Sequence, residues 1–506
     1  MTRVLVVGAG VGGLSTAALL AKAGLDVKVL ESHIYPGGCA GTFYFQGYRF
    51  DAGATLAGGF DPGGPMDRLR QTLALPEWPA KPAELAMMVH LPDRQAIERW
   101  GDDRRWLARH EAFGETDRAF WRWQERTADA MWDLAAQNPP WPPNSPSDLI
   151  KLVASGGRWA NEGGLSRLSP GLAADAFRSV GYHLRNSSEG LRLFVDAQLL
   201  ISAQALSADT VALYGAAALD LPRRGVVHLQ GGMIAIARHL VRALVNSGGE
   251  IRYRHRIQAI QRERDGSFLV KTERHGEFRA DVVVANLTRP NLEQLLAPDK
   301  GIDPARLPKD GWGAFTSYLG VDEAAVEDLQ GLHHQILLDR PLTEGNSVFL
   351  SVSPAWDSER APAGKRAITL STHTRLAPWW QLFEEDRSAY EARKEAYSRR
   401  MVVAAERIMP GLSRGVELQL PGTPVTFQRF TGRARGWVGG YPQTNLFRAQ
   451  RSRVSKGLYI VGDSIFPGQS TAAVAMGGLR VGQQIIESIA SKSTIGEDQQ
   501  ILRAPG

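Results

Sequence analysis

The chain has few of the residues that build disulfide scaffolds and metal centres. Its 506 residues include one cysteine, Cys39, so no disulfide can form within the chain. A cysteine-based zinc or iron–sulfur site is excluded for the same reason. Histidine and acidic residues form no cluster at metal-ligand spacing, and no nucleophile and base stand in a triad-like pattern. We therefore expect neither a metal site nor a hydrolase-type catalytic centre.

Long apolar runs are also missing. None reaches the roughly 18 residues that a membrane-spanning helix needs. The first predicted strand begins at Val4, which leaves no room for a signal or transit peptide before it. We expect a cytoplasmic protein, attached at most to the surface of a membrane and not crossing it.

Neither positive nor negative charge is concentrated in one part of the sequence. The net charge is +6, but the arginines that carry most of it are scattered along the chain. No basic tract is interleaved with aromatic residues in the manner of an RNA-binding motif, so we expect no nucleic-acid partner. Hydrophobic residues make up 43% and charged residues 22%, as in a globular protein. At this length two or three structural units are expected.

A dinucleotide-binding motif stands at the start of the chain. A short strand ends at Gly8, and a helix follows from Val11 to Ala23. Between them, Gly8-Ala-Gly-Val-Gly-Gly13 fits G-x-G-x-x-G in the required context of strand, turn and helix. Gly8 permits the tight turn, Gly10 lets the backbone approach a pyrophosphate, and Gly13 lets the helix pack closely. The helix N-terminus then offers N–H groups and positive partial charge to phosphates.

An acidic residue completes this motif. Glu31 ends the second predicted strand, Val27–Leu30, where a carboxylate is placed to accept hydrogen bonds from both hydroxyls of a ribose. The same negative charge would repel a 2′-phosphate, which argues against NADP. The sequence therefore predicts a dinucleotide whose adenosine ribose carries no phosphate.

Later segments return to the same domain. We expect a short buried strand at 281–285 and a strand at 458–461 followed by a helix from Thr471. We expect an α/β fold in which a Rossmann-like domain with a three-layer parallel sheet is formed by residues 1–75, 220–290 and 440–495. An α+β substrate-binding or lid domain would comprise 76–219 and 291–439, with strands at 315–320, 347–353 and 367–374. Residues 496–506 are expected to form a disordered tail.

Two stretches identify the flavoprotein class. Glu31-Ser-His-Ile-Tyr-Pro-Gly-Gly-Cys-Ala-Gly-Thr42 and Gly457-Leu-Tyr-Ile-Val-Gly-Asp463 resemble the amine-oxidase and carotenoid-desaturase class of FAD proteins. The resemblance implies non-covalent FAD, held by Gly8, Gly10, Gly12, Gly13, Glu31, Gly37, Gly38, Thr42, Gly53, Ala54, Ile257, Gly462, Asp463, Thr471 and Ala472. One position departs from the pattern: an arginine is common after the glycine pair, and here it is Cys39, so a side-chain phosphate contact is not expected there.

The resemblance narrows to carotenoid (phytoene-type) desaturases and isomerases. Arg49-Phe-Asp-Ala-Gly-Ala-Thr55, Gln230-Gly-Gly-Met233 and Val461-Gly-Asp-Ser-Ile-Phe-Pro-Gly-Gln469 carry it, and Phe430-Thr-Gly-Arg-Ala-Arg-Gly-Trp-Val-Gly-Gly440 looks most like the 3,4-desaturase branch. It implies a desaturase that takes a hydrophobic polyene, transfers hydride to flavin N5 and is reoxidised by quinone or oxygen. Alternatives are a redox-neutral isomerase of the prolycopene isomerase type, a retinoid saturase and, outside enzymes, a prenyl-lipid escort protein.

Three further expectations concern single segments. Asp196, an acid in an apolar stretch, is the candidate catalytic residue, and its alternative role is an ion pair with a nearby arginine. His333-His334 is expected in a polar loop. The helix predicted within 113–134 is rich in tryptophan, which suits either peripheral membrane attachment, helped by Arg118, Arg122 and Arg126, or a lid over the substrate domain.

Overall fold

The computed structural model describes residues 1–143, 145–163, 167, 169–300 and 311–501. Its first sheet is six-stranded and collects strands from three distant stretches of the chain. Neighbours pair in parallel except at one edge, where the outermost strand is antiparallel. In sheet order the strands are β20 (Arg453–Ser455), β21 (Leu458–Ile460), β13 (Val282–Ala285), β1 (Arg3–Val7), β2 (Asp26–Leu30) and β9 (Glu250–Arg252). The predicted Rossmann-like α/β architecture is confirmed.

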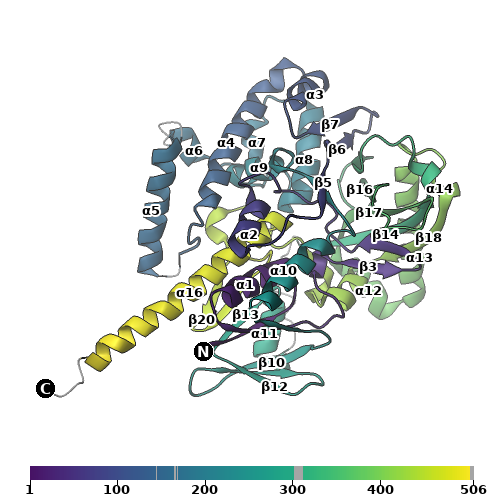
Figure 1. The fold of residues 1–506 in the computed structure, drawn as a ribbon. Coiled ribbons are helices and arrows are strands. Elements are labelled where there is room, and N and C mark those ends of the chain that lie inside the picture. The colour runs from purple at the N-terminus through teal and green to yellow at the C-terminus, as the bar shows by residue number, and fades with distance from the viewer. Residues whose placement is uncertain (144, 164–166, 168, 301–310, 502–506) are drawn as a thin grey trace.

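Helices pack closely on this sheet because glycine opens the contact. Helix α1 (Val11–Lys22) contacts α10 (Ile234–Asn246), α2 (Pro65–Leu73) and α16 (Thr471–Ile501). A Cβ atom on Gly478 of α16 would meet the carbonyl oxygen of Gly12 at 2.6 Å, so only glycine allows this approach. In Figure 1 the far end of α16 projects from the body of the molecule. Residues 496–501, expected to begin a disordered tail, continue this helix, and 502–506 lie outside the described residues.

The second sheet is eight-stranded and almost entirely antiparallel. The strands expected at 315–320, 347–353 and 367–374 all belong to it. Helices α12 (Leu376–Glu385) and α13 (Arg387–Ala405) cover one face. In order the strands are β18 (Val416–Gly422), β14 (Trp312–Asp322), β17 (Lys365–Arg375), β16 (Ser347–Val352), β15 (His333–Leu337), β6 (Leu85–His90) and β7 (Ala96–Trp100), with β19 (Trp437–Val438) beside β14.

A layer of helices packs against the other face of this sheet (Figure 1). Its members are α3 (Arg104–Phe113), α4 (Arg118–Ala136), α7 (Val180–His183), α8 (Glu189–Ala203) and α9 (Ala212–Leu219). Helices α5 (Pro146–Gly163), which contacts α4, and α6 (Pro170–Ala174) lie on the side of α4 away from the sheet (Figure 1). The remaining elements are small: β3 (Thr42–Phe45) with β4 (Tyr48–Asp51), β5 (Ala80–Pro82) with β8 (Val227–Leu229), β10 (Ile257–Arg262) with β11 (Phe268–Thr272) and β12 (Glu277–Ala280), and helices α11 (Arg289–Leu296), α14 (Leu412–Gly415) and α15 (Pro424–Thr431).

The tryptophan-rich helix α4 belongs to the interior of this layer. Trp121 and Trp123 are only 2% and 8% exposed, and they pack with Phe113, Phe120 and Phe194. The expected membrane contact through the apolar face of this helix is therefore wrong, because that face is already buried against protein. The arginines at 118, 122 and 126 lie on its exposed side.

The histidine pair is buried as well. His333 and His334 lie in β15 and are 3% and 1% exposed, so the expectation of a polar loop is wrong. The ring of His334 stacks on that of His90, and the ring of His333 stacks on that of His228. Burial lowers the pKa of His90, His228 and His334 to about 4. These histidines are therefore uncharged at neutral pH.

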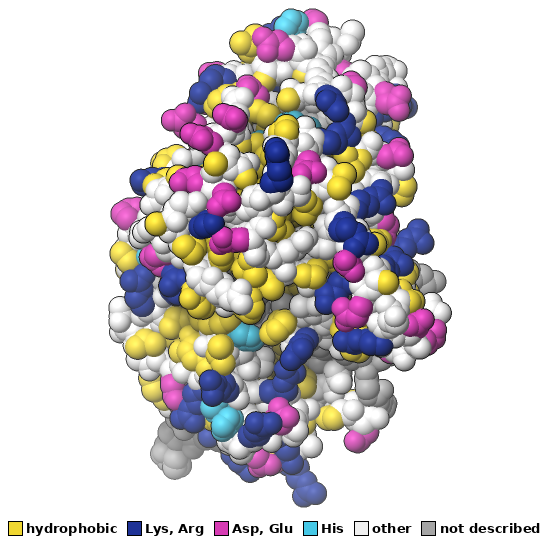
Figure 2. All heavy atoms as spheres, turned by 90° about the vertical axis from the view of Figure 1, so that its right-hand side faces the viewer, with side chains coloured by type: hydrophobic (Ala, Val, Ile, Leu, Met, Phe, Trp, Pro, Cys, Tyr) yellow, Lys and Arg dark blue, Asp and Glu magenta, His cyan; other side chains and the backbone are white. Residues whose placement is uncertain are grey.

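The surface agrees with the scattered charge of the sequence. Figure 2 shows basic side chains singly or in small groups, with acidic and apolar ones between them, on the face that it presents. Within the described part of the chain, no helix combines the length and the apolar character needed to cross a membrane.

Candidate flavin site and substrate cavity

The glycines of the first motif surround one polar side chain. Gly8 has φ +93°, a conformation that side chains rarely adopt. A Cβ atom on Gly13 would meet the carbonyl oxygen of Gly8 at 2.6 Å, and one on Gly10 would collide with the amide of Asn286. Asn286 follows β13, so its position depends on sheet pairing and not on the motif itself. The motif is therefore a close-packed turn that only glycine can form.

Glu31 joins two loops at the edge of this turn. Its carboxylate is buried and accepts hydrogen bonds from the N–H of Ala9 and the N–H of His33, both at 2.7 Å. The hydroxyl of Ser32 also donates to it, at 3.2 Å. A carboxylate offers about four acceptor positions, so one remains for a ribose hydroxyl. The structure thus gives Glu31 a role in holding the glycine turn, and its contact with ribose stays a prediction.

Eight of the fifteen predicted cofactor residues line a single cavity. Its lining includes Gly10, Gly37, Gly38, Gly53, Ala54, Gly462, Asp463 and Thr471. The other predicted residues are not part of the lining; they are Gly8, Gly12, Gly13, Glu31, Thr42, Ile257 and Ala472. Loops that are hundreds of residues apart in sequence therefore face one space.

Two of the residues outside the lining have other contacts. The hydroxyl of Thr42 donates to the carboxylate of Asp51 at 2.6 Å and accepts from the N–H of Ile234 at 3.1 Å. These bonds fix the β3–β4 hairpin to α10. Ile257 begins β10, two residues after His255, whose N–H donates to the carbonyl of Glu31 at 2.8 Å.

A buried arginine at the site was missed by the sequence analysis. Arg433 lies beside Cys39 and forms an ion pair with Asp463, with 3.0 Å between Nη1 and Oδ2. Its Nη2 is buried and has no hydrogen-bond partner among the residues that the structure describes. Burial raises the pKa of the Cys39 thiol despite the nearby guanidinium, so the thiol remains protonated. Arg433 thus brings a cation from a distant segment to Cys39, the position where an arginine is common in the class that the sequence resembles.

This arrangement fits FAD. An unpaired buried N–H of a guanidinium is a donor for phosphate or for the negative charge of reduced flavin. Helix α16 begins at Thr471 in the cavity wall, so its positive end faces the same space. The signal for Arg433 was present in the sequence, since Phe430-Thr-Gly-Arg433 belongs to a stretch that carries the family resemblance.

The same cavity continues across the second sheet. Its wall takes residues from five strands: Ala314 and Thr316 of β14, Ser371 and His373 of β17, Ser347 and Phe349 of β16, Met87 of β6, and Arg99 of β7. Strands lie about 4.8 Å apart, so the path from β14 to β7 covers roughly 24 Å. Helix α8 supplies Gln198, Ile201 and Ser202 on the opposite side. The space is long and narrow and is joined to the cofactor loops.

Asp196 does not face this cavity. Its carboxylate accepts from the N–H of Ser207 at 2.9 Å and from the hydroxyl of Ser207 at 2.5 Å. Its other oxygen pairs with Arg340 at 3.2 Å. The structure therefore gives Asp196 the ion-pair role that the sequence left open, and it provides no support for a catalytic role.

The comparisons with known proteins agree with this site. The model of the flavin containing amine oxidoreductase family matches residues 111–486, and that of an NAD(P)-binding Rossmann-like domain matches 6–73. The chain belongs to the flavin containing amine oxidoreductase family, and FAD is its cofactor.

The relatives that it resembles along most of its length include carotenoid desaturases and isomerases. It is 27% identical to the chloroplastic prolycopene isomerase of Arabidopsis thaliana over 96% of this chain and 82% of the relative. It is 26% identical to the neurosporene-forming phytoene desaturase of Rhodobacter capsulatus over 96% of this chain and 94% of the relative. The structure of putrescine oxidase bound to putrescine shares the fold, with a TM-score of 0.62 and 16% identity over 96% of this chain and 99% of that one.

These findings confirm the predicted family, fold, cofactor and enzyme class. Because the chain is an FAD oxidoreductase, the escort-protein alternative is set aside. The assignment to the 3,4-desaturase branch stays a prediction.

Proposed function

We propose that the protein is an FAD-dependent carotenoid desaturase that introduces a double bond into a long polyene. The long cavity carries this proposal: it is joined to the cofactor loops at Ala54 and Thr55 and extends across the sheet to Arg99. A rod-shaped substrate fits such a space, while a compact amine does not need it. The described residues of the cavity wall include a single carboxylate, Asp463, which suits an uncharged chain better than an amine.

The chain's own residues position the substrate and exclude water. When bound, FAD accepts a hydride from a C–H bond of the substrate. Apolar residues of the cavity wall, such as Leu56, Ala218 and Val226, hold a polyene without competing for hydrogen bonds. Arg433 and the N-terminus of α16 supply positive charge beside the loops that hold the cofactor. Electrons would leave to quinone or oxygen, as the family resemblance implies.

The test is the mass of the product. Purified FAD-loaded protein is incubated with phytoene or lycopene in liposomes, with and without a soluble quinone. Desaturation predicts a product lighter by two hydrogens, formed in proportion to the quinone consumed. Conversion of every substrate without change of mass would contradict desaturation.

Isomerisation is the second candidate, and the relatives favour it. Four prolycopene isomerases match at 26% or 27% identity over at least 96% of this chain. An isomerase changes the geometry of a double bond and consumes no quinone. Incubation with a poly-cis lycopene therefore distinguishes the two: a product of equal mass and altered retention time, formed without added acceptor, supports the isomerase.

We further propose that the polyene enters from a membrane surface beside α5. Leu149, Ile150 and Val153 of this helix are 52%, 72% and 75% exposed and lie on one face. Next to the helix, the ring of Trp141 lies 5.7 Å from that of Phe447, and Phe447 stacks on the exposed Phe177. Exposed apolar side chains at helical spacing are typical of a helix that lies in a bilayer interface.

A second cavity borders the aromatic cluster and shares one wall residue with the main cavity. Phe177 and Phe447 stand in its wall, and so does Gln204, which also lines the main cavity. The exposed Arg448 and Arg451 follow Phe447 and provide charge for an anionic surface. A polyene is insoluble in water, so an entrance that meets the bilayer would spare it exposure to solvent.

Liposome flotation tests this entrance. Ile150→Ser/Val153→Ser should float less with anionic liposomes than wild type and should turn over liposomal carotenoid more slowly. Val403→Ser is the matched control, because Val403 is 63% exposed on α13, away from this surface. Equal flotation of all three proteins would refute the entrance and leave the proposed reaction untouched.

A further inference from the structure

A buried cation stands in the cavity wall at its β7 end. Arg99 lies on β7 opposite Met87 of β6, and both side chains line the cavity. Its Nη1 donates to the carbonyl oxygen of the Gln198 side chain, and its Nη2 donates to the backbone carbonyl of Leu219 at 2.6 Å. Burial lowers the pKa of Arg99 to about 9, so the guanidinium is still charged at neutral pH.

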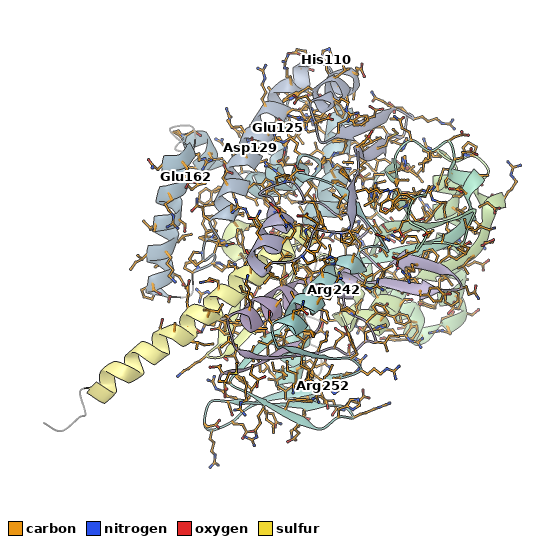
Figure 3. All side chains as sticks on the ribbon, viewed as in Figure 1. His110, Glu125, Asp129, Glu162, Arg242 and Arg252 are labelled. Carbon is orange, nitrogen blue, oxygen red and sulfur yellow. The ribbon has the colours of Figure 1, made fainter. Side chains whose placement is uncertain are left out.

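Asp220, whose charge raises the pKa of Arg99, and Glu125 are each engaged by other arginines. Asp220 pairs with Arg223 and Arg224, each at 2.7 Å. Glu125 pairs with Arg105 at 2.7 Å and with Arg109 at 2.6 Å. Figure 3 labels Glu125 and Asp129 on α4. No ion pair joins Arg99 to any Asp or Glu among the described residues.

The side-chain oxygens of the neighbouring Gln198 and Gln335 already accept hydrogen bonds. The amide of Gln198 accepts from Arg99 and donates to the side-chain oxygen of Gln335. The amide of Gln335 then donates to the carbonyl of Ala197 at 3.0 Å and to the hydroxyl of Ser347 at 3.1 Å. Both amide oxygens are thus engaged, and the hydroxyl of Ser347, which lines the cavity, keeps its proton to donate. This wall offers donors to a ligand.

A hydrocarbon end would leave the charge of Arg99 with two neutral acceptors and with Asp220, which Arg223 and Arg224 already pair. An uncompensated buried charge costs several kcal/mol, whereas a carboxylate can pair with a guanidinium through two parallel hydrogen bonds. Thr55 of the cofactor loops contacts Ser351 of β16, and three strand spacings of about 4.8 Å separate β16 from β7. The charged end would therefore lie roughly 14 Å from the strand that meets the cofactor loops, away from the reacting carbons.

We infer that the preferred substrate is a polyene with a carboxylate at its leading end, and that Arg99, oriented by Gln198, binds this carboxylate. The inference rests on the proposed function and narrows it from carotenoids in general to oxygenated, acidic ones. Arg99 is a specificity-determining residue here, since it would fix how far the chain enters the cavity and hence which bond meets the cofactor.

Equilibrium binding to the FAD-loaded protein tests the inference through the absorption of the polyene itself. The probes are all-trans-retinoic acid, all-trans-retinol and lycopene, at neutral pH. Wild type should bind the acid roughly ten- to hundredfold more tightly than the alcohol, the range expected for charge-assisted hydrogen bonds. Arg99→Met should remove this preference and leave retinol binding almost unchanged. Arg99→Lys should keep part of it.

Arg122→Met is the matched control, because Arg122 is exposed on α4, outside the cavity. Retinol binding and FAD content of each variant report whether the fold survives. Wild-type protein that binds lycopene and retinol as tightly as the acid would overturn the inference while the proposed function stands. Protein that binds none of the three probes would instead contradict the proposed function.

Discussion

The cofactor site and the helical layer over the second sheet differ in how they are specified. At the cofactor site, Gly8 and Gly13 are required by backbone geometry within one turn, and Gly10 is required by the adjacent amide of Asn286. In the helical layer, Trp121 and Trp123 pack against residues from other helices, including Phe194 of α8. The first region depends on local spacing and the second on distant contacts. Substitutions should therefore remove the cofactor in one region and destabilise the fold in the other.

The largest effect is expected at Gly10. In Gly10→Val, a branched side chain would collide with the amide of Asn286 and occupy the approach to the pyrophosphate. We expect loss of FAD while most of the fold survives, measured as flavin absorbance per protein alongside circular dichroism. Full flavin occupancy in this variant would contradict the assignment of the motif.

A substitution at Trp121 tests the helical layer. Trp121→Ala should lower the free energy of unfolding by about 3–5 kcal/mol, the cost of removing a buried aromatic ring. Urea unfolding measures the change, and Arg122→Ala, one position away on the exposed side of α4, should change it by less than about 0.5 kcal/mol. A stable Trp121→Ala that loses liposome binding would restore the membrane role of this helix.

Arg433 lies in a segment outside the Rossmann motifs, yet its side chain reaches Asp463 and Cys39 at the cofactor site. Arg433→Met should weaken FAD binding by about 1.5–3 kcal/mol, as expected for hydrogen bonds to a charged group. Arg433→Lys should recover part of the loss. Titration of apoprotein with FAD gives the affinities. Glu31→Ala should weaken binding by a similar amount through the ribose and through the loop that Glu31 holds.

FAD should be released on denaturation. The cofactor loops hold no histidine or tyrosine in an evident linkage pattern, and the Cys39 thiol remains protonated beside Arg433. Acid precipitation should leave the yellow colour in the supernatant. Colour that stays with the precipitated protein would show a covalent bond.

A fall in pH should lower the stability of the fold mainly through the buried histidines of the second sheet. Burial lowers the pKa of His334 and of His373 to about 4, below the ordinary value of 6.5. The unfolded chain therefore binds more protons than the folded one between these values, and stability falls as the pH drops from about 6.5 toward 4. Each such histidine contributes up to about 1.4 kcal/mol per pH unit. Urea titrations at several pH values should show a shallower slope for His334→Asn.

The sequence by itself determined the cofactor half of this protein. The turn at Gly8, the acid at Glu31 and the strand before Asp463 are local patterns, because a tight turn or a buried strand imposes its residue types over a few positions. The same is true of three strands of the second sheet, β14, β16 and β17, whereas β15, with its histidine pair, was expected to be a loop. The family and FAD followed from these patterns.

Only the tertiary structure decided which polar residues share the substrate cavity. Arg433 stands beside Cys39, Arg99 faces Gln198, and Asp196 turns away to Arg340, although each pair is far apart in sequence. No local pattern reports whether a charged side chain on a strand or helix meets a partner, a cavity or solvent. That outcome depends on the order of the strands and on the packing of the helices, as it does for Arg99 on β7.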